Sequence, residues 1–282
     1  MIRYPISKTD LERLIDVENP TWRTRAAQKT EAFRTAGSYL AGSDFWSDIK
    51  SVFITFQGTG KCIFCERKLE SDKYGKIEHD VEHFRPKGNI KGWKLPKSLA
   101  NQGITVSEPP GSGGYHLLAY NPLNYATSCK TCNSILKKDC FPVSGSHIPS
   151  LEDPANGTQE KPLLIYPVSE IDDDPADLIE FEGIIPKPKA SRGHKRNRAL
   201  VTIEFFKLHK EGGRTNLLKD RALVIGFIFP ILEANDPSDL QKINRNLPHF
   251  NCIQSFIRLY QADRPRAKKI YEAAKELVLS TS

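Results

Sequence analysis

The sequence predicts an α+β protein in which helices flank a central unit braced by zinc. Two observations lead to this expectation. Helix start and stop signals dominate both ends of the chain, and two C-x-x-C pairs lie between them beside a stretch with strand-like alternation. We expect an N-terminal helical region over residues 1–57, the cysteine-containing unit over 58–145 and a mostly helical C-terminal domain over 146–282.

The composition is that of a globular protein with an excess of positive charge. The chain has 282 residues, 39% of them hydrophobic, and a formal net charge of +7. No run approaches the roughly 18 apolar residues of a membrane span, and the first residues lack an apolar leader, so we expect a cytoplasmic protein without a membrane partner. The basic balance favours a polyanionic partner. Six cysteines in such a chain favour metal binding or burial over disulfides.

The N-terminal region is expected to hold three helices. The first covers 7–18, and the second covers 19–37 and ends at Gly37, a residue type favoured at helix ends. Ser43 is a candidate N-cap for a third helix over 44–56. The glycines in "QGTG" then interrupt the helical pattern.

The C-terminal region begins with strand signals and continues with helices. "KPLLIYP" at 161–167 predicts a short strand, and 177–189 predicts a hairpin with Gly183 at its turn. Pro230 should kink or end the helix in which it lies. The helices expected here cover residues 196–209, 216–235 and 266–280.

Four cysteines form the strongest local signal. Cys62 and Cys65 stand in "KCIFC", and Cys129 and Cys132 stand in "SCKTC". Two C-x-x-C pairs supply the four thiolates of a tetrahedral structural zinc site. Because a long insert separates the pairs, we expect the zinc to hold a substantial segment between them.

That insert contains "EHDVEHFRPKG", which concentrates acids, imidazoles and cations. Alternation over 76–84 predicts a strand, with histidines on one face and acids on the other. Glu82 and His83 at its end offer an oxygen ligand for a divalent ion and a neighbouring base. Asn133 follows the ligand Cys132 directly, so its amide oxygen is a second candidate ligand.

"VEHFRPKG" followed by "LNYATSCKTCN" resembles the motif of HNH endonucleases, which have a zinc-bound ββα-metal core. The resemblance implies that His83 is the general base and that Glu82 and Asn133 hold a catalytic Mg²⁺ or Mn²⁺. It implies that Asn124 orders the loop carrying the base. Many members have His where this chain has Asn133.

Several cations follow the predicted base. Arg85, Lys87 and Lys91 are candidates for contacts to DNA phosphates on either side of a cut. Such contacts weaken with salt and carry little sequence information.

A longer and looser similarity covers residues 60–225. "GGYHLLAYNPLNYATSCKTCN", "KPLLIYP" and "DDPADLIEFEGIIPKP" resemble the HNH nuclease subunits of Septu-type and retron-associated anti-phage systems. This resemblance implies a DNA endonuclease that cuts phage or plasmid DNA and works with an ATPase partner subunit.

Two other interpretations remain open. A non-catalytic zinc-finger protein that binds nucleic acid or a partner would need the four cysteines alone. A stand-alone restriction-type nuclease would need a basic recognition helix, for which "SRGHKRNRAL" at 191–200 is a candidate.

Overall fold

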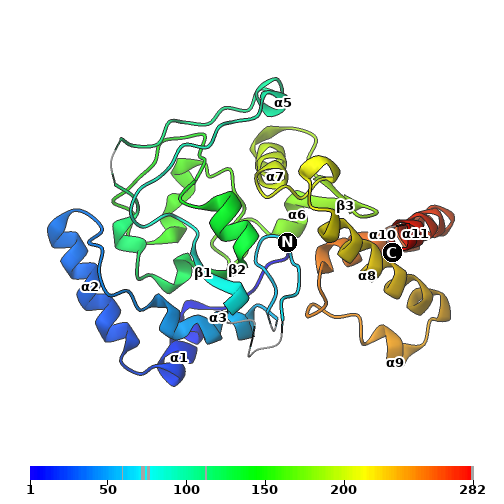
Figure 1. Cartoon of the computed structure of the whole chain (residues 1–282), viewed down its shortest axis with the longest axis horizontal. Coiled ribbons are helices and arrows are strands. Elements are labelled where there is room, and N and C mark those ends of the chain that lie inside the picture. The colour runs from blue at the N-terminus through cyan, green and yellow to red at the C-terminus, as the bar shows by residue number, and fades with distance from the viewer. Residues whose placement is uncertain (59, 71–73, 75–76, 112, 281–282) are drawn as a thin grey trace.

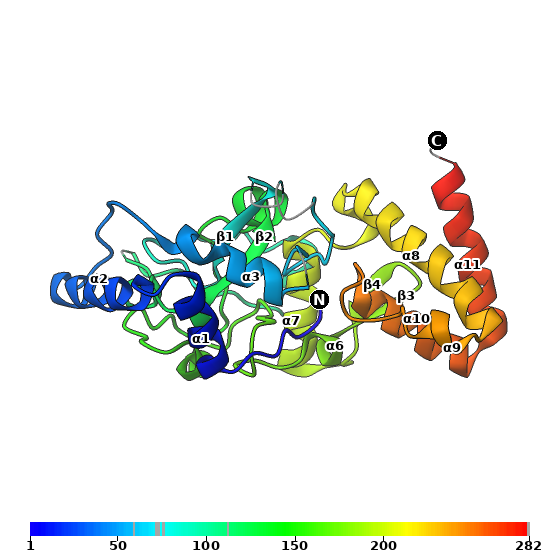
Figure 2. The ribbon, with the colours of Figure 1, turned by 90° about the horizontal axis from the view of Figure 1, so that it is seen from below.

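The computed structural model describes residues 1–282 except 59, 71–73, 75–76, 112 and 281–282. The α-helices and strands have the following bounds: α1 Lys8–Glu18, α2 Trp22–Ala36, α3 Lys50–Phe56, β1 His79–His83, α5 Lys97–Ala100, β2 Tyr125–Cys129, α6 Pro175–Leu178, β3 Ile179–Glu182, β4 Ile185–Pro188, α7 Gly193–Phe205, α8 Thr215–Ala234, α9 Pro237–Leu240, α10 Phe250–Ala262 and α11 Arg264–Leu279. The molecule is elongated, with α1–α3 towards one end and α8–α11 at the other (Figures 1 and 2).

The N-terminal helices follow their local signals with one exception. The hydroxyl of Ser7 caps α1 by accepting from Asp10 N at 3.0 Å, and α2 ends at Gly37, whose φ is +64°. The third helix is shorter than expected. A 3₁₀ turn, η1 (Trp46–Ile49), precedes α3, and Ser43 caps neither element.

The central sheet is small and antiparallel. β1 pairs with β2 in a register that sets His79 opposite Cys129 and His83 opposite Tyr125. The chain leaves β2 into a single π-helical segment, η4 (Thr131–Lys137). Two 3₁₀ turns, η2 (His116–Leu118) and η3 (Pro122–Asn124), lead into β2. The mixed α and β architecture expected from the sequence is therefore confirmed.

The C-terminal part confirms some expectations and corrects others. The predicted hairpin is present as β3 and β4, with Gly183 at its turn at a φ of +58°. α8 continues past Pro230 to Ala234. α10 was not predicted, although it carries a regular apolar face that packs against α8 and α11.

The predicted strand at 161–167 is wrong. Residues 163–167 are buried, but the described segment makes one isolated bridge, between Val143 and Pro162, and Lys161 has a left-handed φ of +49°. Their backbone groups bond elsewhere, for example Ile165 N to the Thr202 hydroxyl at 3.2 Å. A short apolar run signals burial without specifying a ladder partner.

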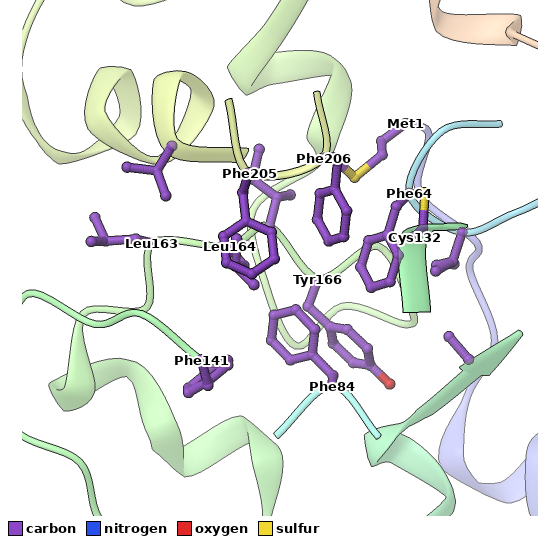
Figure 3. Close-up of a cluster of buried hydrophobic side chains, with 14 of the residues drawn as sticks. Met1, Phe64, Phe84, Cys132, Phe141, Leu163, Leu164, Tyr166, Phe205 and Phe206 are labelled. Carbon is purple, nitrogen blue, oxygen red and sulfur yellow. The ribbon is translucent and has the colours of Figure 1, made fainter. Parts of the chain in front are cut away.

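Three hydrophobic clusters support the fold. The largest surrounds the cysteines and includes Phe64, Phe84, Tyr166 and Phe206, which lie close together in Figure 3. A second joins α1–α3 to the segment before β2, and a third joins α8, α10 and α11. The largest cluster draws on both sides of the domain boundaries predicted after residues 57 and 145, and those boundaries stay a prediction. Within the described residues, no helix is long and apolar enough to cross a membrane.

Candidate active site and metal centre

The four cysteines come together as the sequence predicts. The Sγ atoms of Cys62, Cys65, Cys129 and Cys132 lie within 4.8 Å of one another, and all four residues are buried. A tetrahedral zinc with bonds of about 2.3 Å separates its sulfur ligands by about 3.8 Å, and the Sγ atoms of Cys65 and Cys129 are 3.9 Å apart. The cluster thus fits a structural zinc whose four thiolates leave no open position.

The cysteine cluster and the predicted base lie at opposite ends of the same two-stranded sheet. Cys129 ends β2 opposite His79, whereas His83 ends β1 opposite Tyr125. Gln57 joins this sheet to α3, because its side chain accepts from Thr127 N at 2.7 Å and donates to Thr127 O at 3.0 Å. Metal binding by the cysteines would therefore hold the strand that positions His83.

His83 is oriented by a backbone carbonyl. Its Nε2 lies 3.0 Å from Ala119 O, and because a carbonyl only accepts, Nε2 must carry the proton. This leaves Nδ1 as the acceptor, with no hydrogen-bond partner among the residues described. Burial, followed by the charge of Lys87, lowers the pKa of His83 to about 3, so the imidazole is neutral at pH 7. A neutral, oriented imidazole with a free nitrogen has the form that a general base requires.

Asn124 clamps the segment that follows His83. Its Oδ1 accepts from Arg85 N at 2.9 Å, and its Nδ2 donates to Arg85 O at 3.0 Å. Its own carbonyl accepts from Phe84 N at 2.9 Å. This buried side chain therefore fixes both peptide groups of Arg85, as the expected role in ordering the loop requires.

The N-terminal region completes the surroundings of His83, which sequence reasoning missed. The Trp46 ring lies edge to face with the His83 ring at 4.9 Å between centroids. Lys87 places its Nζ 4.3 Å over the same Trp46 ring, and burial lowers the pKa of Lys87. Lys87, an expected phosphate contact, thus lies next to the predicted base, where its cation could meet an anionic substrate.

Glu82, an expected metal ligand, is buried in an ion pair with Lys137. It is 2% exposed, and its Oε1 lies 2.5 Å from Nζ of the fully buried Lys137. The same Nζ donates to His83 O at 3.0 Å. Burial raises the pKa of Glu82, while Lys137 lowers it. The carboxylate is therefore neutralised by a cation of the chain itself.

Asn133 also faces a different partner from the one expected. Its Nδ2 donates to Asp80 Oδ2 at 3.2 Å, and Ser134 donates to the same oxygen at 3.1 Å. Glu82 and Asn133 thus contact different residues, Lys137 and Asp80. The Asn133 amide oxygen, the predicted ligand atom, takes no part in its contact, and the catalytic divalent site stays a prediction.

The other two predicted phosphate contacts have contrasting positions. Arg85 is 3% exposed, and its Nε donates to the fully buried Glu160 at 2.9 Å. This structural ion pair does not fit a contact to DNA backbone. Lys91 pairs with Asp139 at 2.7 Å, but its side chain is exposed. Because the pair lies at the surface, a phosphate can reach the Lys91 ammonium.

The basic stretch 191–200 is largely engaged within the chain. Arg198 is buried and binds Asp172, Lys195 pairs with Asp173 at 3.0 Å, and Arg196 donates to Gln102. These contacts weaken its interpretation as a recognition helix.

Lys137 and the Ala119 carbonyl were also missed by sequence reasoning. A lysine five residues after Cys132 is a weak sequence signal for such a contact, whereas a backbone carbonyl gives no signal.

Comparison with curated proteins gives one relative. Over 219 residues, 73% of this chain, the sequence is 29% identical to the Septu protein PtuB of Bacillus mycoides (strain KBAB4). The chain is similar to a Septu protein. The match covers 66% of that relative, so the chain spans just under two thirds of its length. No family model and no solved structure matches the chain. This similarity supports the Septu resemblance found in the sequence and leaves the HNH assignment a prediction.

Proposed function

We propose that this chain is an HNH endonuclease with a ββα-metal core that hydrolyses phosphodiester bonds in DNA. The observation that carries the proposal is the state of His83. Its Nε2–H is held by Ala119 O, its Nδ1 is free to accept a proton, and Lys87 lies beside it.

The chain's own residues account for two requirements of hydrolysis. His83 Nδ1 takes a proton from water, whose oxygen bonds to phosphorus while the bond to one bridging sugar oxygen breaks. That sugar oxygen leaves with the bonding electrons and takes a proton from solvent. The ammonium of Lys87 offsets charge that develops on the phosphate oxygens. A phosphate next to His83 also favours the imidazolium and so strengthens a base whose pKa is low in the free protein.

The two proposed metal ions, zinc and either Mg²⁺ or Mn²⁺, would have different roles. Zinc at the four cysteines would hold the sheet and take no part in the reaction. Dependence on Mg²⁺ or Mn²⁺ is proposed from the HNH resemblance alone, because Glu82 is paired with Lys137 and Asn133 with Asp80. Any divalent ion at Glu82 would have to compete with Lys137.

We also propose that the chain is the nuclease subunit of an anti-phage defence system. The similarity to a Septu protein supports this biological setting. An ATPase partner subunit is proposed from the resemblance to Septu-type systems, since an uncontrolled nuclease would endanger the host genome. Co-purification of a tagged chain from its host, followed by mass spectrometry, tests for that subunit.

The decisive experiment is plasmid cleavage by the zinc-loaded chain, alone and with its co-purified partner, with and without Mg²⁺ or Mn²⁺. His83→Ala should abolish cutting while zinc content stays at one per chain. His209→Ala is the matched control, because His209 is partly exposed and pairs only with Glu204 and Glu211. Cutting that survives His83→Ala contradicts the proposed base.

A non-catalytic zinc-finger protein remains the second candidate. The engaged states of Glu82 and Asn133 favour it, since a binding module needs no divalent site. Tight DNA binding without cleavage, under every metal and partner condition, would support this candidate and overturn the nuclease.

A further inference from the structure

A cavity of about 280 Å³ lies behind the segment that follows His83. Its walls come from Phe84 and Arg85, the 3₁₀ segment η5 (Pro154–Glu160), the loop containing Tyr166 and Asp172, and α7. The volume is near the lower end of the about 300–1,000 Å³ typical of ligand sites. It therefore suits a small ligand.

One part of the wall is apolar. The rings of Phe84 and Tyr166 pack against each other, 4.4 Å apart between centroids at an interplanar angle of 31°, and Ile171 adds an aliphatic side chain. Both rings are at most 3% exposed, so this wall favours an apolar part of a ligand.

Arg85 presents an unused donor to this cavity. Its Nε is bound to Glu160, and its Nη2 makes a long contact of 3.4 Å to Gly157 O. Its Nη1 has no partner within the described part of the chain. A Cβ at Gly157 would come within 2.0 Å of Nη2, so glycine is what allows the guanidinium to lie there.

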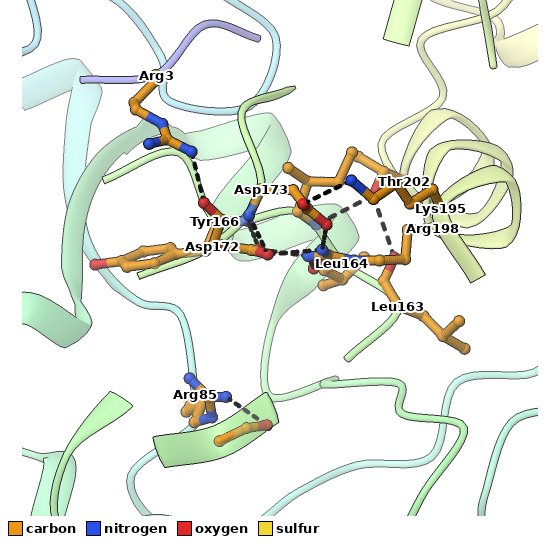
Figure 4. A network of polar contacts seen from close by, with 12 residues as sticks. Arg3, Arg85, Leu163, Leu164, Tyr166, Asp172, Asp173, Lys195, Arg198 and Thr202 are labelled. Atoms are coloured by element: carbon orange, nitrogen blue, oxygen red, sulfur yellow. Dashed lines mark hydrogen bonds and ion pairs between the residues drawn. The ribbon is translucent and has the colours of Figure 1, made fainter. Parts of the chain in front are cut away.

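Carboxylates lie on the other side of the cavity. Figure 4 shows Arg85 on one side of an open space and the cluster of Asp172, Asp173 and Arg198 on the other. Asp173 accepts from Arg198 at 3.2 Å and from Lys195 at 3.0 Å, and its side chain remains 36% exposed. A carboxylate has about four acceptor sites, so Asp173 can accept further hydrogen bonds.

The charges around the cavity are already balanced. Arg85 is paired with Glu160, while Arg198 and Lys195 together offset Asp172 and Asp173. Binding a free phosphate or carboxylate here would add an uncompensated anion next to two acids. A neutral ligand with acceptors on one edge and donors on another fits better.

We propose that this cavity binds a guanine base. Guanine is small, planar and uncharged, and its O6 and N7 are adjacent acceptors that arginine recognises. Its amino group lies on the edge away from N7 and donates hydrogen bonds. With O6 and N7 at Arg85, this amino group would face the Asp173 carboxylate across the cavity. Adenine carries an amino donor where guanine has O6, so it would oppose the Arg85 donor.

The site also contacts the segment that carries the candidate base. Phe84 and Arg85 follow His83 directly, and Asn124 holds both peptide groups of Arg85. The guanine could belong to a nucleic-acid strand or to a free nucleoside. The inference does not depend on phosphodiester hydrolysis.

Isothermal titration calorimetry of the zinc-loaded full chain tests the proposal with guanosine, adenosine and inorganic phosphate. Guanosine should bind about tenfold or more tightly than adenosine, and phosphate should not compete. Asp173→Asn should remove most of this preference, because the amide can turn a donor towards the ligand. Ile171→Trp should fill the cavity and abolish binding, with circular dichroism confirming the fold.

A second arm separates the two sources of guanine. Single-stranded oligothymidylate with and without one dG is titrated into His83→Ala protein, so that hydrolysis cannot interfere. Binding that needs the dG, without binding of guanosine, assigns the site to a strand. Equal affinity for guanosine and adenosine, persistence of binding in Ile171→Trp, or no binding of guanosine or the dG strand would overturn the proposal.

Discussion

Replacing Lys137 by methionine should destabilise the protein strongly, although Lys137 lies on a short surface helix. The change keeps a long side chain but leaves the Glu82 carboxylate buried without its cation, 2.5 Å away in the wild type. Removing one partner of a buried ion pair costs about 3–5 kcal/mol. At about 2–4 °C per kcal/mol for a chain of this size, the Tm should fall by about 10 °C.

The pH dependence of the stability loss in Lys137→Met shows whether the unpaired charge of Glu82 causes it. Burial raises the pKa of Glu82 and Lys137 holds it down, so loss of Lys137 raises it further. A carboxyl whose pKa is raised in the folded state binds its proton more readily when folded. The destabilisation is therefore largest at neutral pH and is relieved as the pH falls through the raised pKa of folded Glu82.

Thermal unfolding of zinc-loaded variants by circular dichroism provides the assay. Glu82→Met combined with Lys137→Met should be more stable than either single variant, because both buried charges are then absent. Lys130→Met is the control, since Lys130 is exposed and pairs with Asp80 at only 3.5 Å. A Tm for Lys137→Met within 2 °C of wild type, or single effects that simply add in the double variant, would refute the reasoning.

Three further predictions concern zinc, DNA and pH. Cys129→Ser should lose zinc by elemental analysis and lower the Tm, whereas retained zinc would refute the four-cysteine site. Lys87→Ala should reduce the slope of log K against log salt in DNA-binding anisotropy by about 0.9, and the exposed control Lys94→Ala should leave it nearly unchanged. Because the pKa of His83 is about 3, kcat/KM for cleavage should stay level from about pH 8 to 5. An acidic limb near 6.5 would show an unperturbed histidine instead.

Local patterns predicted the features that depend on nearby residues. The C-x-x-C spacing predicted the zinc cluster, because each pair of ligands comes from a single turn. Ser7 and Gly37 predicted helix ends for the same reason, and Gly183 marked the β3–β4 turn. These signals rest on backbone geometry over a few residues.

Side-chain roles were less predictable where the partner is distant in sequence. Arg85 looked like a phosphate contact, but Glu160 pairs with it from 75 residues away. The Ala119 carbonyl that orients His83 leaves no trace in the sequence at all. The sequence alone does not show whether a charged side chain is exposed to solvent or paired with a buried residue.

The sequence by itself determined the α+β class, the four cysteines that come together and the position of His83 beside an acid. Only the tertiary structure decided that Glu82 is neutralised by Lys137, that Trp46 and Lys87 lie beside His83, and that Arg85 lines a cavity. The physical reason is burial. A charge removed from water is stable only when it is paired with an opposite charge, and the folded chain determines which residue supplies that charge.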